Sequence, residues 1–416
     1  MAAADERMLN MLRNKLYQDL RTEIDGMDII STHEHNIIPQ EVPTLGYIFR
    51  NSYIRGCGVK PGDTSEERAE FLDTVQVNSY YRWLLVALQD LYDFDGEITP
   101  GNWDEISRRI ASAHKKPDWY FEIMQKHGNI KRAILDAYWH PGHDNNHPEF
   151  YSSTFRINAF IMSYAPSATD HNGNSGLEVL AKHGMEVNSF EDYLDGLKKL
   201  LHLKKNQGCV AVKSALAYDR SLDFEPVSRD AAAAVFTKQG QNVDPLEAKL
   251  FGDYVFYFIA KEAGKLALPL QCHVGLGKIQ GSNPMHLIPV IENCPETKFV
   301  LMHGGYPWYH EIAGLLHNYH NVYADLVWLP LISPTAAVNA LHEWIEVALS
   351  QTKISWGGDA WTPEEVYGGV LSIRHVLARV LAEKIDEGYM SKEIALRLAG
   401  RILKDNAIGL YGLKES

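Results

Sequence analysis

The chain has 416 residues, of which 45% are hydrophobic and 22% are charged. This composition is typical of a folded globular protein and argues against disordered, fibrous and coiled-coil classes. The 40 Lys and Arg residues are outnumbered by 53 Asp and Glu residues, so the formal net charge is -13. There is no basic tract to neutralise phosphates, and we expect no nucleic-acid partner.

The first strand candidate follows an N-terminal segment without the pattern of a targeting signal. Charged residues recur every few positions there, and no apolar run in the chain approaches the roughly 18 residues that span a bilayer. The four cysteines are far apart and form no CxxC motif, which favours reduced thiols. We therefore expect a cytoplasmic protein that does not enter a membrane.

Eight short apolar runs rich in β-forming residues are the predicted strands. They cover residues 27–35, 130–138, 155–163, 209–218, 266–275, 298–305, 321–329 and 353–361. From the third run onward, helical patterns separate them. Strands that alternate with helices predict a parallel sheet, and eight of them favour a (β/α)8 TIM barrel over an open sheet. We expect one α/β domain over residues 1–416.

Several of the helical patterns have clear start signals. Segment 189–208 follows Ser189, a predicted N-cap, and segment 244–264 follows Asp244 in the same way. The pattern recurs after the last strand at Thr362. The alternation is interrupted once, because about ninety residues (36–129) lie between the first two strands. This segment contains an amphipathic stretch and is predicted to be a helical insertion above the first strand.

Polar residues of metal-binding type occupy the ends of five predicted strands. They are His33 and His35 on the first strand, Lys213 on the fourth, His273 on the fifth, His303 on the sixth and Asp359 on the eighth. Catalytic groups of barrel enzymes gather at the carboxyl ends of the strands. Side chains alternate along a strand, so His33 and His35 share one face while Glu34 points to the other.

Imidazole and carboxylate groups are ligands of zinc-like divalent ions. We therefore predict one or two divalent metals, with Zn2+ favoured, at this end of the barrel. Such an ion lowers the pKa of bound water toward about 7. Asp359 is placed to take the proton of that water and pass it to a leaving group.

This order of residues along the strands resembles the amidohydrolase superfamily, over about residues 28 to 412. The motifs VKSALAYDRSLDF, LQCHVGLG, ETKFVLMHGGYPW, NVYADLVWL and ISWGGDAWTPEE are similar to the amidohydrolase-related branch that includes the nodulin-like domain fused to glutamine-synthetase-like proteins. The resemblance implies that His33, His35 and Asp359 hold the first metal. It implies that His273 and His303 complete a second position or flank a single ion.

The resemblance leaves two points open around the fourth strand. Lys213 can be carboxylated and bridge two metals, or remain a free ammonium near the substrate. Where the branch leads us to expect Ala-Tyr-Arg, this chain has Ala-Tyr-Asp-Arg, with Tyr218, Asp219 and Arg220. The departure weakens the transfer of a substrate-binding role to Arg220.

A second resemblance is to uronate isomerases, through the stretch NSYYRWLLVALQDLYDF, the HEHNIIP motif and the closing LAGRILKDNAIGLYG. That chemistry implies an arginine for the substrate carboxylate. The candidates by position are Arg55, Arg82, Arg220 and Arg374.

Three further residues are predicted to lie near the substrate: Tyr218, Asp325 and Trp361. Asp325 lies near the end of the seventh strand. A second carboxylate, a partner that orients a ligand histidine, and a helix or turn cap are the interpretations that remain open.

We predict a metal-dependent hydrolase of an amide or other C–N bond, or of an ester or lactone, in a small polar molecule. Metal-activated water attacks, and Lys213, His303 and Asp359 are the predicted catalytic residues. The alternatives are a uronate-type isomerase, a metal-dependent decarboxylase and a barrel that has kept only its scaffold. We also expect a homo-oligomer formed through the outer helices, which light scattering tests.

Overall fold

The computed structural model describes residues 2–414, and their side chains from residue 14 onward. Eight strands form one sheet in the order of the chain, and each pairs in parallel with the next. They are β1 (Ile29–Glu34), β2 (Ile130–Leu135), β3 (Tyr151–Arg156), β4 (Cys209–Ser214), β5 (Leu270–Cys272), β6 (Phe299–Leu301), β7 (Val322–Asp325) and β8 (Ile354–Ser355). This is the predicted (β/α)8 architecture.

The barrel closes between its first and last strands. The backbone nitrogen of Thr32 donates to the carbonyl of Trp356, and the nitrogen of His35 donates to the carbonyl of Ala360. The nitrogen of Asp359 in turn donates to the carbonyl of His33. The two ends of the sheet are therefore joined at the very residues that were predicted to bind metal.

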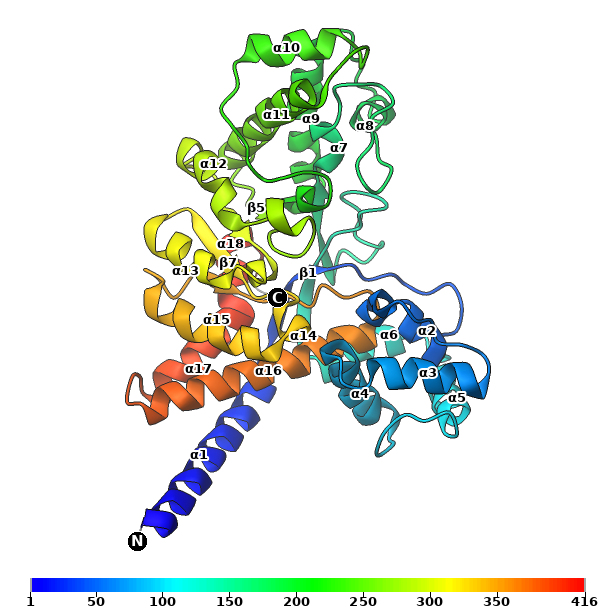
Figure 1. The fold of residues 1–416 in the computed structure, drawn as a ribbon, viewed down its shortest axis with the longest axis vertical. Coiled ribbons are helices and arrows are strands. Elements are labelled where there is room, and N and C mark those ends of the chain that lie inside the picture. Colours follow the sequence, from blue (N-terminus) through cyan, green and yellow to red (C-terminus); the bar gives the residue numbers. More distant parts are fainter. Residues whose placement is uncertain (1, 415–416) are drawn as a thin grey trace.

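Helices surround the barrel (Figure 1). After β3 come α7 (Asn158–Ile161), α8 (Gly176–Lys182) and α9 (Phe190–Asn206); after β4, α10 (Arg229–Thr237) and α11 (Pro245–Lys265); then α12 (Ile288–Asn293), α13 (Tyr309–Asn318), α14 (Leu329–Ile332) and α15 (Pro334–Val347) between the later strands. The chain finishes with α16 (Pro363–Asp386), α17 (Lys392–Gly400) and α18 (Asn406–Tyr411). Ser189, Asp244 and Thr362 cap α9, α11 and α16 as predicted.

The insertion between β1 and β2 is helical, as the sequence predicts. It comprises α2 (Leu45–Arg50), the 3-10 turn η1 (Tyr53–Cys57), α3 (Ser65–Val75), α4 (Ser79–Tyr92), α5 (Trp103–Ala113), α6 (Trp119–Glu122) and η2 (Ile123–His127). In Figure 1 these helices lie together beside α16, and α4 packs against that helix. Phe49, Phe71 and Trp103 form a buried aromatic core within it. Helix α1 (Ala2–Asp25) extends from the body, and its C-terminal part packs against α16.

The third strand differs from the prediction. It covers 151–156 rather than 155–163, and its sequence, Tyr-Ser-Ser-Thr-Phe-Arg, is mostly polar although every residue is buried. The apolar residues after it form α7 instead. The prediction followed hydrophobicity, whereas this strand turns polar side chains toward the barrel interior.

Among the described residues, none of the helices combines the length and apolar character needed to cross a membrane.

Candidate metal centre and cavity

Three predicted ligands meet at the carboxyl ends of β1 and β8. Oδ1 of Asp359 lies 3.4 Å from Nε2 of His33 and 3.3 Å from Nε2 of His35. All three residues are buried, and one ligand atom from each lies within 4.8 Å of the others. His-His-Asp is a donor set that divalent transition metals accept.

The hydrogen bonds of the two imidazoles fit a metal. Nδ1 of His33 donates to the Gln271 side-chain carbonyl (3.2 Å), and Nδ1 of His35 donates to the backbone carbonyl of Asp136 (2.8 Å). These bonds leave both Nε2 atoms unprotonated and turned toward Asp359. Burial lowers the pKa of both rings, most strongly for His33, and so favours the neutral form that binds metals.

Unsatisfied polar atoms give a second, independent indication. Nε2 of His33 and Oδ1 of Asp359 are buried without any hydrogen-bond partner. Orphaned buried polar atoms are rare because each costs desolvation energy of about 1–3 kcal/mol. A cation held between them removes that cost, so the residues present fit a divalent ion.

The turn that carries Asp359 is held in an unusual conformation. Asp359 has a φ of 63°, in the left-handed region that non-glycine residues seldom adopt. The carboxylate of Glu34 accepts hydrogen bonds from the backbone nitrogens of Gly358 (3.0 Å) and Ala360 (2.9 Å), on either side of it. A Cβ atom on Gly358 would lie 2.4 Å from Glu34, so glycine is required there. Glu34 thus faces away from the metal position and fixes the turn.

Tyr53, from the insertion, contacts the same carboxylate and was missed by the sequence analysis. Its hydroxyl donates a short hydrogen bond to Oδ2 of Asp359. Its ring stacks on Trp328, with 4.4 Å between centroids, and meets Trp361 edge-on. No local pattern marks Tyr53, because it reaches Asp359 only through the packing of η1 on the barrel.

His273 and His303 line the same cavity but are not part of the three-residue group. Nε2 of His273 is engaged by a short contact with the carbonyl of Leu276. Both ring nitrogens of His303 are buried without a hydrogen-bond partner, and its Nδ1 lies 3.7 Å from Oδ2 of Asp359. His303 is therefore available to a ligand, whereas His273 is partly committed to its own loop.

The opposite side of the cavity is cationic. Arg156, on β3, forms a buried ion pair with Asp136, with Nε 3.1 Å from Oδ2. Lys213, on β4, is buried, and its ammonium contacts the sulfur of Met302 at 2.7 Å. Burial lowers the pKa of Lys213 to about 8. Neither Arg156 nor Asp136 was predicted as a site residue, although both lie within runs marked as strands, 155–163 and 130–138.

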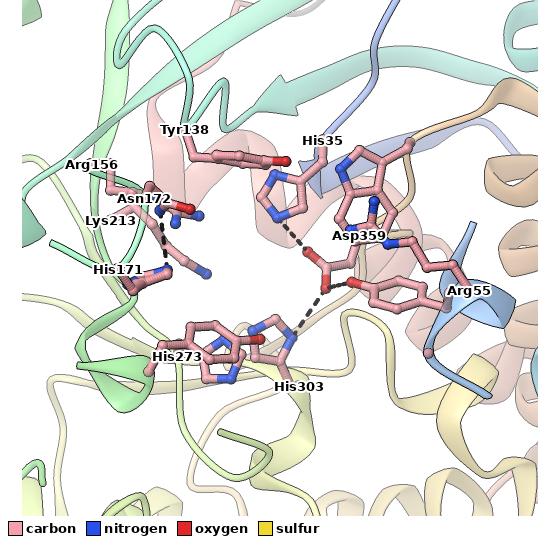
Figure 2. Close-up of a pocket in the computed structure, with 14 residues that line it drawn as sticks. His35, Arg55, Tyr138, Arg156, His171, Asn172, Lys213, His273, His303 and Asp359 are labelled. Atoms are coloured by element: carbon pink, nitrogen blue, oxygen red, sulfur yellow. Dashed lines mark hydrogen bonds and ion pairs between the residues drawn. The ribbon is translucent and has the colours of Figure 1, made fainter. Parts of the chain in front are cut away.

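These groups surround a cavity of about 330 Å³, shown in Figure 2. Of the predicted substrate-binding residues, Arg55, Tyr218 and Trp361 line it. The guanidinium of Arg55 lies over the ring of Trp361, 4.3 Å from its centroid. Within the described residues, Arg55 forms no ion pair at 4.0 Å or less.

The other predicted substrate-binding residues lie outside the cavity lining. Arg82 forms an exposed ion pair with Glu97 (2.7 Å). Arg220 is paired with Asp253 (2.6 Å) and lines a different cavity.

Two further candidates are also engaged elsewhere. Arg374 lies near Asp25 (3.8 Å), at the junction of α16 and α1. Asp325 accepts hydrogen bonds from Thr32, Ser355 and the Val327 nitrogen. It therefore ties β1, β7 and β8 together beneath the site, closer to the turn-cap interpretation than to substrate binding.

A family model described as amidohydrolase matches residues 221–413. The protein fluG of Emericella nidulans is 32% identical over 225 residues, which are 50% of this chain and 26% of that protein. A uronate isomerase of Shouchella clausii is 24% identical over 302 residues, 64% of this chain and 61% of the enzyme. The chain thus spans less than two thirds of these relatives' lengths.

Solved structures share the fold over almost the whole chain. The uronate isomerase of Thermotoga maritima superposes with a TM-score of 0.76 at 18% identity, covering 95% of this chain and 97% of its own. A Lactobacillus casei protein provisionally named a metal-dependent hydrolase superposes with a TM-score of 0.71 at 20% identity. The match covers 94% of this chain and 97% of that protein. At these identities the likeness establishes the barrel. The segment matched by the amidohydrolase family model, residues 221–413, carries His273, His303 and Asp359.

Proposed function

We propose that the protein is a metal-dependent hydrolase that cleaves an amide or other C–N bond, an ester or a lactone in a small anionic molecule. The observation that carries the proposal is the group of His33, His35 and Asp359, in which Nε2 of His33 and Oδ1 of Asp359 face each other without hydrogen-bond partners. The family match over residues 221–413 supports the same class.

One divalent ion, with Zn2+ favoured, fits this group better than two. Among the described residues, this is the one group of three or more His, Cys, Asp or Glu side chains whose ligating atoms all lie within 4.8 Å of one another. Lys213 has the sulfur of Met302 as its neighbour and stays an ammonium in this proposal. A bound ion would supply Lewis acidity and water of lowered pKa.

The protein's own residues then have separate tasks. Asp359 accepts the proton of the attacking water, and burial already raises the pKa of its carboxyl group. The Tyr53 hydroxyl holds Oδ2 of that carboxylate in place. His303 donates a hydrogen bond from its unpartnered ring to the carbonyl oxygen, on which negative charge develops.

The anionic character of the substrate follows from the charges around the cavity. Arg55, Arg156 and Lys213 line it, and Asp359 is the carboxylate among the lining residues. Arg156 is neutralised by Asp136, which leaves Arg55 and Lys213 as the cations that a substrate anion meets. Arg55 is the more accessible of the two and suits a carboxylate, which its guanidinium binds through two hydrogen bonds.

The same arginine favours a second candidate, sugar-acid isomerisation, in which a carboxylate must also be held. Relatives and solved structures described as uronate isomerases add weight to it. The two reactions differ in their products, so one assay panel separates them.

The test uses protein stripped of metal and reconstituted with Zn2+. It is assayed against N-acyl amino acids, carboxylate-bearing esters and lactones, and uronates, with uncharged analogues as controls. We expect metal-dependent hydrolysis of anionic compounds and none in His33→Ala. Interconversion of uronates without hydrolysis would assign the isomerase instead, and turnover that does not require metal would contradict the site.

A further inference from the structure

A histidine and an aspartate form a pair in the same cavity, away from the metal candidates. His171 lies in the loop between α7 and α8, and Asp219 directly follows the turn after β4. Nδ1 of His171 is 2.9 Å from Oδ2 of Asp219, and the backbone nitrogen of His171 donates to Oδ1 at 2.8 Å. Two contacts between the same two residues fix their relative orientation.

The carboxylate of Asp219 is itself held firmly. Its side chain is 4% exposed, and the amide of Asn158 donates to Oδ2 at 2.6 Å. The ammonium of Lys278 binds the backbone carbonyl of Asp219. A fixed, buried carboxylate is the group that orients the imidazole in enzymes that use histidine for proton transfer.

The partners of the ring define which nitrogen carries the proton. Asp219 accepts, so Nδ1 of His171 donates to it. The amide of Asn172 lies 3.1 Å from Nε2, where it donates to an unprotonated nitrogen. Both His171 and Asn172 line the cavity, on the side away from Asp359 in Figure 2. A substrate that displaces the Asn172 amide therefore meets Nε2.

This pair accounts for an irregularity in the sequence. Asp219 is the residue that separates Tyr218 from Arg220, where Ala-Tyr-Arg was expected. The pair is formed by this residue, and Arg220 turns instead to Asp253.

We propose that His171 is a second proton-transfer residue of this cavity, with Asp219 as its positioning residue. The inference rests on the proposed hydrolysis. Water gives one proton to Asp359 and its oxygen forms a bond to the carbonyl carbon. His171 takes up a proton at Nε2 from solvent, and as the C–N bond breaks the nitrogen keeps the bonding electron pair and takes this proton. The products are a carboxylic acid and an amine, and the proton on Asp359 returns to His171 through solvent.

The titratable and charged groups around His171 come from four segments of the chain. Asp219 binds its ring, the Tyr218 ring lies 5.1 Å away, and Lys278 contacts the backbone of Asp219. On its own loop, Asp170 binds backbone nitrogens of that loop, and Arg156 lines the same cavity. Among these groups, Asp219 is thus the one carboxylate that contacts the His171 ring directly.

The test compares His171→Ala, Asp219→Asn and a control, His310→Ala. His310 makes an equivalent contact with Glu343 (2.6 Å), but on the exposed surface. We expect kcat/KM on the amide substrate to fall roughly 100-fold in His171→Ala, with one limb of the pH profile lost and partial rescue by added imidazole. In Asp219→Asn, kcat/KM should fall about tenfold, and in His310→Ala it should equal the wild-type value. Near wild-type kcat and pH profile in His171→Ala would overturn the proposal.

A second measurement does not depend on activity. In ¹⁵N NMR spectra at high pH, His171 should show a protonated Nδ1 and an unprotonated Nε2. Asp219→Asn should change the ratio of the two neutral tautomers of the ring. A ring protonated at Nε2 in the wild type would overturn the proposal even if no hydrolysis were found. Hydrolysis by the wild type with full activity in His171→Ala would refute this inference while leaving the proposed function standing.

Discussion

The two sides of the cavity differ in whether their buried polar groups have partners within the protein. On the metal side, formed by His33, His35 and Asp359 at the ends of β1 and β8, Nε2 of His33 and Oδ1 of Asp359 face each other without hydrogen-bond partners. On the cationic side, Arg156 is matched to Asp136 through a buried ion pair. An unpaired buried charge is costly, and a paired one is tolerated.

The comparison separates a group that needs an ion to complete it, His33, His35 and Asp359, from the pair of Arg156 and Asp136, which is complete without one. Removing a residue from the metal side should abolish binding of the ion and with it the reaction. Changes at the rim or in supporting residues should alter affinity or pH dependence and leave the reaction in place. The following predictions run from the largest expected effect to the smallest.

Asp359→Asn should remove the central carboxylate of the metal side. Loss of a group that both binds the ion and accepts a proton is expected to lower kcat/KM by roughly 100- to 10,000-fold. Steady-state kinetics measures this loss, and circular dichroism checks that the barrel remains folded. Activity within threefold of the wild type would show that Asp359 is not part of the machinery.

Glu34→Gln should weaken the turn that presents Asp359. The two carboxylate oxygens of Glu34 accept hydrogen bonds from Gly358 and Ala360, and a glutamine keeps only one of these oxygens. We expect metal affinity to fall by roughly 10- to 100-fold, as is usual for residues that support a metal ligand. Titration of metal into the apo protein measures the change. An unchanged affinity would mean that Gly357 and Gly358 hold the turn without help.

The same residue gives a prediction on stability. Burial raises the pKa of Glu34 from 4.5 to about 8, so the folded state binds a proton more tightly than the unfolded state. The corresponding stabilisation is present below pH 4.5 and is lost as the pH rises to about 8. Denaturation of the metal-free protein at a series of pH values measures the free energy of unfolding. Over this range the free energy of unfolding should decline less in Glu34→Gln than in the wild type. An equal slope of unfolding free energy against pH in the wild type and Glu34→Gln would contradict this prediction.

Arg55→Ala tests the cation that lies over Trp361, on the Asp359 side of the cavity (Figure 2). Loss of a hydrogen-bonding guanidinium should raise KM for anionic substrates about tenfold while kcat changes little. Arg82→Ala is the matched control, because Arg82 lies in the same insertion but is paired with Glu97 outside the cavity. Equal effects of the two substitutions would remove Arg55 from the substrate site.

Tyr53→Phe should have the smallest effect. The Tyr53 hydroxyl lowers the pKa of Asp359, whose carboxyl group is otherwise raised by burial. Without it that pKa rises, so the acidic limb of the pH profile should move to higher pH, with a loss of roughly three- to tenfold in activity. A profile that does not move would show that the hydrogen bond is not made in solution.

Much of the barrel could be predicted because its strands and helices are marked locally. Ser189, Asp244 and Thr362 start helices by capping, which depends on a few neighbouring residues. The convergence of His33, His35 and Asp359 follows from their positions at strand ends once the barrel is assumed. The third strand was misplaced because its interior face is polar, which hydrophobic patterns do not detect.

The remaining site residues depend on contacts between distant segments. Tyr53 reaches Asp359 across 306 positions of the chain, and His171 reaches Asp219 from another loop. A tyrosine in an insertion or a histidine in a polar loop carries no sequence signal for such a contact. These residues became candidates only once the packing of the loops around the cavity was known.

The central claim is that the metal side binds one divalent ion. Its most direct test is titration of Zn2+ into the metal-free protein, followed by calorimetry and checked by elemental analysis of the purified chain. We predict one tightly bound equivalent in the wild type and none in His33→Ala. No tight binding by the wild type, or equal binding by the variant, would contradict the account.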